Sequence, residues 1–223
     1  MWVKDLTNIA FYSLGFLGLF GLGELIYHVF KAPVEISRKF VHLGTGIITL
    51  SFPLVLNTHW SVLTLTLSFI LLLSISIQLG WFKSINAIDR VSKGSVLYPI
   101  IIYITFLFYR KFDDLLFFYL PILILAISDP MAALFGKRWP YGKYRIFREK
   151  KTIVGSSAFF ISSFIICLAF AAPLREGWIE ALVIPLIVSL VATITEAASQ
   201  RGWDNFFIPL SVIGSLIGTA ILF

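Results

Sequence analysis

Seven basic residues gather in one short stretch of the chain, KRWPYGKYRIFREKK, which runs from residue 137 to residue 151. Aromatic residues alternate with them, as in a membrane-surface loop that binds anionic lipid. The residues that follow favour the phosphates of a nucleotide instead. Lys151 and Thr152 stand where an apolar helix should begin, and the free N–H groups of a helix start attract phosphate. We therefore expect phosphate contacts from Lys137, Arg138, Lys150, Lys151, Thr152, Gly155 and Ser156.

Acidic side chains in otherwise apolar sequence form a second group. Asp129 lies in ISDPMAALFGKR, and TEAASQRGWDN supplies Glu196, Asp204 and Asn205. Ionisable groups inside a bilayer are costly and by default indicate function. Mg²⁺ binds one or two carboxylates together with substrate phosphates, and phosphoryl transfer depends mainly on positioning and electrostatics. We expect these four residues to hold Mg²⁺ beside the phosphates of a nucleoside triphosphate, with a lipid as the acceptor.

The elements that must position these groups are transmembrane helices. The mean hydropathy is +0.91 and only 13% of the residues are charged, against about 25% in soluble domains. The sequence predicts an all-α polytopic transmembrane helical bundle of seven or eight spans, with residues 1–223 forming a single integral-membrane domain. The fourth apolar segment is short, and a re-entrant helix there would leave seven spans. The eight segments are 7–30, 40–56, 60–80, 96–109, 115–136, 152–172, 178–199 and 206–223.

The distribution of lysine and arginine predicts the orientation. With eight spans, the loops around 31–39, 81–95, 137–151 and 201 lie on one side and hold most of the 18 basic residues. The positive-inside rule places these loops in the cytoplasm and the N-terminus outside. The same loops account for the net charge of +6, so nucleic acid is not an expected partner. The polar residues within the spans all fall in the cytoplasmic half, whereas a transporter usually places them near the midplane. This pattern favours an enzyme supplied from the cytosol.

Several short patterns predict local structure. Asp129 followed by Pro130 suits the start of a helix, so we expect a broken span with a half-helix from Pro130 to Gly136. A continuous helix with a mild kink is the alternative. Glu24 and His28 are one turn apart and are expected to pair. The small residues of Gly15-Phe-Leu-Gly18 and Gly214-Ser-Leu-Ile-Gly218 suit close helix packing.

Four motifs together resemble a known family. They are RKFVHLGTG (38–46), SDPMAALFGKRWP (128–140), EKKTIVGS (149–156) and TEAASQRGWDNFFIP (195–209). The chain is similar in these motifs to the membrane polyprenol kinases, which include dolichol, phytol and farnesol kinases and the CTP-dependent diacylglycerol kinases. A wider kinship links them to phosphatidate cytidylyltransferases. The resemblance spans about residues 38–210.

The resemblance implies a kinase that transfers the γ-phosphate of CTP to a membrane isoprenoid alcohol with Mg²⁺. Asp129, Lys151 and His42 would be the catalytic residues, and Arg38 and Lys39 would join the phosphate site. The many extra N-terminal spans of eukaryotic dolichol kinases are missing. We therefore expect a shorter alcohol, such as phytol or geranylgeraniol, and a place in a bacterial inner membrane.

Three other functions stay open on the sequence alone. A phosphatidate cytidylyltransferase-like enzyme would form a CDP-lipid, and a diacylglycerol kinase would use a two-chain acceptor. A lipid or ion transporter would need no nucleotide. The sequence decides neither the nucleotide nor the oligomeric state.

Overall fold

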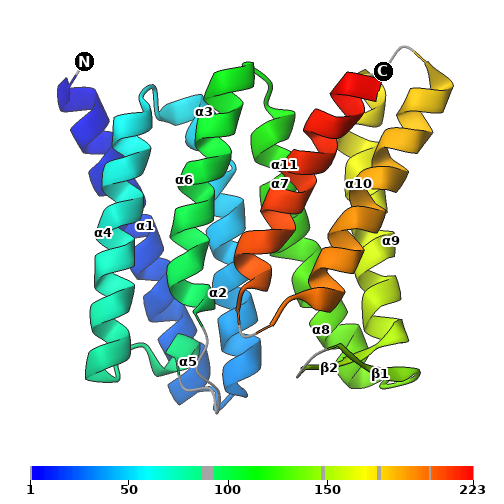
Figure 1. Cartoon of the computed structure of the whole chain (residues 1–223). Coiled ribbons are helices and arrows are strands. Elements are labelled where there is room, and N and C mark those ends of the chain that lie inside the picture. Colours follow the sequence, from blue (N-terminus) through cyan, green and yellow to red (C-terminus); the bar gives the residue numbers. More distant parts are fainter. Residues whose placement is uncertain (1, 87–92, 147–148, 175–176, 201, 223) are drawn as a thin grey trace.

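Helices make up nearly the whole protein (Figure 1), whose computed structural model describes residues 2–86, 93–146, 149–174, 177–200 and 202–222. Most of them run between two ends of one bundle. Short helices and one β-hairpin lie at these ends. In chain order the elements are α1 (Trp2–His28), α2 (Val34–Thr49), α3 (Phe52–Val55), α4 (His59–Leu79), α5 (Lys83–Asn86), α6 (Gly94–Phe112), α7 (Leu116–Leu123), η1 (Ile124–Ser128), α8 (Asp129–Arg138), β1 (Lys143–Ile146), β2 (Glu149–Thr152), α9 (Ile153–Phe170), η2 (Ala172–Leu174), α10 (Trp178–Ala198) and α11 (Asp204–Leu222).

Seven helical stretches within the described residues are long and apolar enough to cross a membrane. They include α6, whose 19 residues cover the fourth predicted segment. The alternative that this segment is a short re-entrant helix is therefore wrong. The shorter element is α2, with 16 residues, which together with α3 joins the two ends of the bundle in Figure 1. The all-α membrane bundle expected from the sequence is confirmed.

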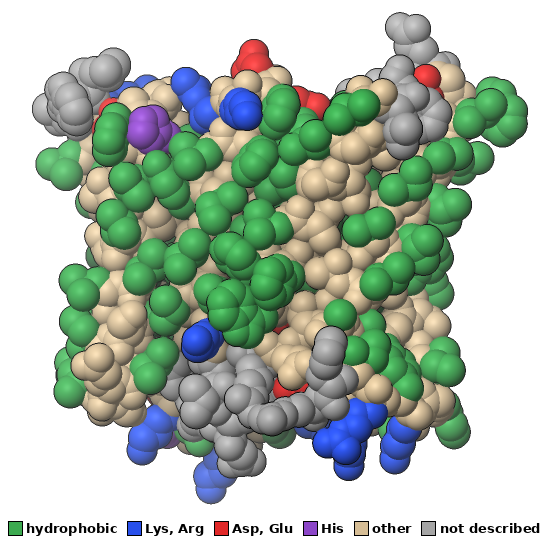
Figure 2. All heavy atoms as spheres, viewed as in Figure 1, with side chains coloured by type: hydrophobic (Ala, Val, Ile, Leu, Met, Phe, Trp, Pro, Cys, Tyr) green, Lys and Arg blue, Asp and Glu red, His purple; other side chains and the backbone are tan. Residues whose placement is uncertain are grey.

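One end of the bundle, called the basic end below, carries the lysine- and arginine-rich loops. Helices α1, α4, α8 and α10 end there, and α2, α6, α9 and α11 begin there (bottom of Figure 1). The two chain termini lie at the opposite end. Figure 2 shows a belt of hydrophobic side chains between two ends at which charged side chains gather. This is the arrangement expected of a bundle surrounded by hydrocarbon and exposed to water at both ends.

The span that carries Asp129 is the central one. It runs through α7, η1 and α8, and 78% of its apolar window is buried inside the protein, compared with 22–39% for the other six. Helices α6, α9 and α11 pack against it. Because protein surrounds this span, a charged side chain on it can face other polar groups instead of lipid.

Asp129 and Pro130 lie inside a continuous helix, so the predicted break at this point is wrong. Ser128 and Asp129 both have right-handed helical backbone angles. The segment η1, which ends at Ser128, forms a π-type turn. Proline has no N–H, and its ring clashes with the carbonyl four residues earlier in an α-helix. The wider π register pairs each carbonyl with the residue five positions on, which accommodates the ring.

The glycines predicted to pack helices together do not do so. A Cβ atom added at Gly15, Gly18, Gly214 or Gly218 would meet nothing within 4 Å, so these positions lie beside open space. The close approach occurs between α8 and α9. There a Cβ atom on Gly136 would lie 2.7 Å from Oγ1 of Thr152 and 3.3 Å from Cα of Gly155.

The basic stretch after α8 contains an antiparallel hairpin, β1–β2, where the sequence predicts only a loop. Tyr144 pairs with Lys151, and Arg145 pairs with Lys150. Residues directly opposite each other on paired strands point to the same face, and successive residues along one strand point to alternate faces. Consequently Tyr144 and Lys151 point toward the bundle, while Arg145 and Lys150 are exposed to solvent.

Candidate active site

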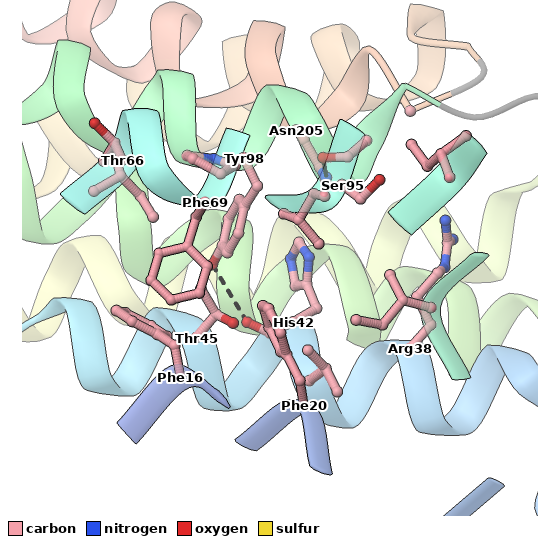
Figure 3. Close-up of a pocket in the computed structure, with 18 of the residues that line it drawn as sticks. Phe16, Phe20, Arg38, His42, Thr45, Thr66, Phe69, Ser95, Tyr98 and Asn205 are labelled. Carbon is pink, nitrogen blue, oxygen red and sulfur yellow. Dashed lines mark hydrogen bonds between the residues drawn. The ribbon is translucent and has the colours of Figure 1, made fainter. Parts of the chain in front are cut away.

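A cavity of about 600 Å³ runs inside the bundle from the basic end toward the opposite end. Its walls come mainly from α1, α2, α4 and α6, with α8 and α11 at the basic end. Figure 3 shows aromatic rings along its length and Thr66 and Arg38 toward its two ends. The polar residues cluster at the basic end: Arg38, Lys39, His42, Asp129, Asp204 and Asn205. The structure thus brings together six of the residues singled out in the sequence.

Asp129 is buried, with 6% of its surface exposed, and forms an ion pair with Lys39 of α2. These residues are 90 positions apart in the chain. Breaking such a buried pair leaves an uncompensated charge, which is strongly unfavourable. Lys39 therefore supplies the neutralising partner that the sequence near Asp129 lacks, and the pair lies in the wall of the cavity.

His42 links α2 to the π-type turn. Its Nε2 atom donates a hydrogen bond to the main-chain oxygen of Leu125, at 3.0 Å. In the π register that oxygen would pair with Pro130, which has no N–H. A carbonyl oxygen only accepts, so Nε2 carries a proton, and Nδ1 of the neutral ring is left as an acceptor. The ring stacks on Tyr98, with centroids 4.6 Å apart, and the Tyr98 hydroxyl donates to the His42 carbonyl (3.3 Å; Figure 3).

Asp204 and Asn205 bring the start of α11 to the same end of the cavity. Asn205 donates from its side chain to the Gly94 carbonyl at 2.8 Å, and its N–H donates to the Asp204 carboxylate at 2.9 Å. The first contact ties α11 to the start of α6. The side chains of Asp204 and Asp129 both line this end of the cavity. A cation between two such carboxylates would relieve the repulsion of their charges.

The described residues hold no group of three or more histidine, cysteine, aspartate or glutamate side chains placed to bind a metal. Mg²⁺ does not require one, because it commonly keeps water and phosphate ligands and uses only one or two carboxylates. Asp129 and Asp204, with the Asn205 side chain beside them, fit this pattern. Glu196 lies outside the cavity wall, and one of its carboxylate oxygens is paired with Lys151, so its expected role as a metal ligand stays a prediction.

Glu196 pairs with Lys151, the inward-facing lysine of the hairpin. The ammonium group also donates to the Glu196 main-chain oxygen at 3.1 Å. Burial alone would lower the pKa of Lys151, but the adjacent carboxylate outweighs this and holds the pKa above its ordinary value. Lys151 also interacts electrostatically with Asp204 and Asp129. It is therefore a fixed positive charge beside the two cavity carboxylates.

The start of α9 is less open to phosphate than the sequence suggests. Thr152 caps the helix, since its side chain accepts the Gly155 N–H at 3.0 Å. The Ile153 N–H donates to the Gly142 carbonyl at 3.0 Å. The Gly155 N–H is thus engaged by Thr152 in this structure, and Gly155 permits the contact with Gly136. The expected phosphate roles of Thr152 and Gly155 stay predictions. Ser156 bonds to the Tyr144 hydroxyl and holds the hairpin against α9.

The other predicted phosphate ligands lie on the outside of the basic end. Lys137 pairs with the exposed Glu35 of α2, the Arg138 guanidinium lies 5.7 Å from the centre of the Trp139 ring, and Lys150 is exposed. They surround the site without entering the cavity. Such positions suit the attraction of an anion more than its final placement.

Sequence reasoning missed the apolar part of the site. Tyr98, Phe16, Phe20 and Phe69 line the cavity, yet each looks like an ordinary hydrophobic residue of a span. Only the packing of α1 against α2 and α4, and of α4 against α6, shows that their rings border an open space (Figure 3).

Comparison with known proteins finds one relevant similarity. The chain is 26% identical over 187 residues to a protein named phytol kinase from Synechocystis sp. (strain ATCC 27184 / PCC 6803 / Kazusa). The match covers 84% of this chain and 80% of that relative. No family model matches the chain, and no solved structure matches it.

Proposed function

We infer that the chain belongs to the polyprenol and phytol kinase family, and from this premise we propose that it transfers the γ-phosphate of CTP to a membrane isoprenoid alcohol. It is an integral membrane kinase that acts on a lipid alcohol. The proposal adds the nucleotide, the type of alcohol and the side of the membrane. Phytol or geranylgeraniol is the acceptor proposed, and residues 1–223 act as one catalytic domain.

The observation that carries the proposal is the continuity of the cavity. A single space joins the carboxylates of Asp129 and Asp204 to a long passage walled by aromatic and aliphatic side chains. A prenol has a matching polarity, with one hydroxyl at the end of an apolar chain. The hydroxyl would lie at the basic end beside Asp129 and His42, and the chain would fill the passage. Burial of the chain supplies binding energy far from the reacting oxygen, which helps to orient it.

The nucleotide would approach from the basic end. The exposed side chains of Lys137, Arg138 and Lys150 attract its negative charge, and Lys39, Arg38 and Lys151 lie nearer to the cavity carboxylates. Lys39 and Lys151 are each paired with an acid in the structure. Phosphate oxygens would compete for these lysines and leave Asp129 available as a ligand.

Asp129 and Asp204 are the residues proposed to hold Mg²⁺, with Asn205 beside them. When bound, the ion would neutralise charge on the transferred phosphoryl group. Within this arrangement Lys39 and Lys151 stabilise the charge on the phosphate oxygens. His42 is held with Nε2 as a donor, so its Nδ1 is the atom proposed to accept the hydroxyl proton of the lipid.

The basic end is proposed to face the cytoplasm, because cytoplasmic loops carry the excess of lysine and arginine. CTP is present on that side of the membrane, so nucleotide and lipid would meet at the mouth of the cavity. In a bacterium the membrane concerned would be the inner one.

The test uses the purified protein in lipid nanodiscs with Mg²⁺, a panel of CTP, UTP, ATP and GTP, and a panel of prenols and diacylglycerol. We expect CDP and a lipid monophosphate, with prenols preferred to diacylglycerol. Release of pyrophosphate with formation of a CDP-lipid would contradict the proposal and identify a cytidylyltransferase. Solute or lipid flux in proteoliposomes without nucleotide, and no phosphorylated product, would identify a transporter.

A further inference from the structure

The cavity is closed at the end far from the catalytic groups. Phe16 of α1, Phe52 of α3 and Phe69 of α4 form an aromatic floor there. The Phe16 ring packs edge-to-face on Phe52 and on Phe69, with centroid distances of 6.2 and 5.2 Å. Phe52 is 1% exposed, and its ring also packs edge-to-face on Tyr12 with centroids 4.9 Å apart, so it is enclosed by protein. Such edge-to-face clusters add stabilisation beyond the burial of each ring.

The length of the passage can be followed along α4. Leu65, Phe69, Leu73 and Ile77 occur at every fourth position and all line the cavity, because residues four apart share one face of a helix. Twelve residues separate the first from the last, a rise of about 18 Å. Ile77 is 45% exposed and Leu65 is 1% exposed. The passage is therefore open toward the basic end and blind at the other.

We propose that the aromatic floor limits the length of the isoprenoid chain, because it sets the longest prenol whose hydroxyl still reaches Asp129 and His42. The hydroxyl of a prenol longer than the passage cannot reach the carboxylates. A much shorter chain leaves apolar wall uncovered and binds weakly, since affinity grows with the apolar area buried. This proposal deepens the proposed function and depends on it.

Thr66 provides a way to shorten the passage. It lines the cavity one position after Leu65, and among the described residues its hydroxyl bonds only within α4, to the Val62 carbonyl at 2.9 Å and the Leu63 carbonyl at 3.1 Å. Its replacement breaks no bond between elements. Thr66→Phe adds a ring near the blind end, whereas Phe52→Leu removes one from the floor.

The experiment compares kcat/KM for prenols of increasing numbers of isoprene units. We expect Phe52→Leu to raise the ratio of kcat/KM for longer prenols to kcat/KM for shorter prenols, and Thr66→Phe to lower this ratio. Each change should be at least about tenfold, the discrimination that a misfit of one methylene group produces in an apolar pocket. Phe118→Leu is the matched control, because Phe118 is equally buried on α7 but lies outside the cavity wall. Profiles that stay unchanged in both variants would overturn the proposal.

A second measurement does not depend on catalysis or on stable variants. Prenyl methyl ethers cannot be phosphorylated, and their binding to the wild-type protein can be followed by the rise in its unfolding temperature. We expect stabilisation to increase with chain length up to one length and then to fall. A steady increase with no limit would contradict the floor. If the ethers show a limit but no prenol is phosphorylated, the proposed function fails while the length measurement stands.

Discussion

The Nε2 atom of His42 lies 3.0 Å from the main-chain oxygen of Leu125, a carbonyl whose partner in the π register would be the N–H that Pro130 lacks. The bond connects two motifs that are far apart in the sequence. It also fixes the helical turn immediately before Asp129. The position of this carboxylate in the cavity therefore depends on a histidine in another helix as well as on its own backbone.

Asp129→Asn is expected to reduce kcat by at least about a hundredfold, as does the loss of one electrostatic group in other active sites. The amide keeps the shape of the side chain but cannot neutralise Lys39 or bind a cation as a carboxylate does. Turnover is measured in nanodiscs, with insertion checked by size-exclusion chromatography. Glu35→Gln is the control, because Glu35 is an exposed acid paired with Lys137, and it should retain activity. An active Asp129→Asn protein would remove this residue from the catalytic site.

His42→Phe keeps an aromatic ring beside Tyr98 but leaves the Leu125 carbonyl without its donor. An unsatisfied buried group costs about 1–3 kcal/mol, so we expect a lower unfolding temperature and a fall in kcat. His42→Gln can still donate to that carbonyl and should restore the unfolding temperature. It lacks the Nδ1 acceptor, so kcat should stay low. If His42→Gln restored both, the residue would only hold the turn in place and would accept no proton.

Lys151→Ala is expected to destabilise the protein by about 3–5 kcal/mol, because it leaves the buried Glu196 carboxylate unpaired. Lys151→Ala combined with Glu196→Gln should recover much of this stability, since no unpaired charge remains. It should not recover the apparent affinity for CTP, which depends on the lysine. Arg145→Ala is the control on the solvent-exposed face of the hairpin and should change both quantities little. Full recovery of CTP affinity in the double variant would contradict a phosphate role for Lys151.

The contribution of the Lys151–Glu196 pair to the stability of the folded protein is also expected to be insensitive to pH over the physiological range. A lysine whose folded-state pKa is raised above its ordinary value of 10.5 contributes stability fully below that value. The contribution is lost only as the pH rises through the raised pKa. The difference in unfolding temperature between the wild type and the double variant should therefore be constant from about pH 7 to about pH 9. A difference that fades within this interval would show that Lys151 loses its proton early.

Gly136→Ala is expected to destabilise the protein by about 1–3 kcal/mol, because the added methyl group would overpack the contact between α8 and α9. Its Cβ would lie 2.7 Å from Thr152 Oγ1. Gly214→Ala is the matched control in open space, where alanine should be neutral or stabilising, since glycine costs about 1 kcal/mol in a helix. Thermal unfolding in detergent compares the two. Equal effects would mean that α8 and α9 do not approach as closely as described.

Much of the fold could be predicted from the sequence, because long runs of apolar residues directly indicate membrane-spanning helices. The Glu24–His28 pair, at 3.1 Å, followed from helical spacing alone. The π-type turn could not be foreseen, since Asp129-Pro130 is compatible with a helix start or with a helix interior. The glycine motifs misled for a related reason. Gly15 and Gly214 resemble packing positions in a sequence, but only the neighbouring helices decide whether anything lies beside them.

The site was predictable where charge makes a residue costly. Asp129, Asp204 and Lys39 stand out in apolar sequence or next to it, and all three line the cavity. The cap that Thr152 forms on α9 could not be foreseen, because a threonine at a helix start can either bind an anion or cap its own helix. The aromatic floor gave no signal, because a phenylalanine that borders a cavity and one that fills a core look the same in a sequence.

The contact between Gly136 and Gly155 has a consequence for motion. With no side chains between them, α8 and α9 lie too close to slide independently, and Ser156 and Tyr144 fasten the hairpin to the same pair. The hairpin, α9 and the helix that carries Asp129 therefore pack as one unit, which connects the water-exposed surface of the basic end to the buried carboxylate.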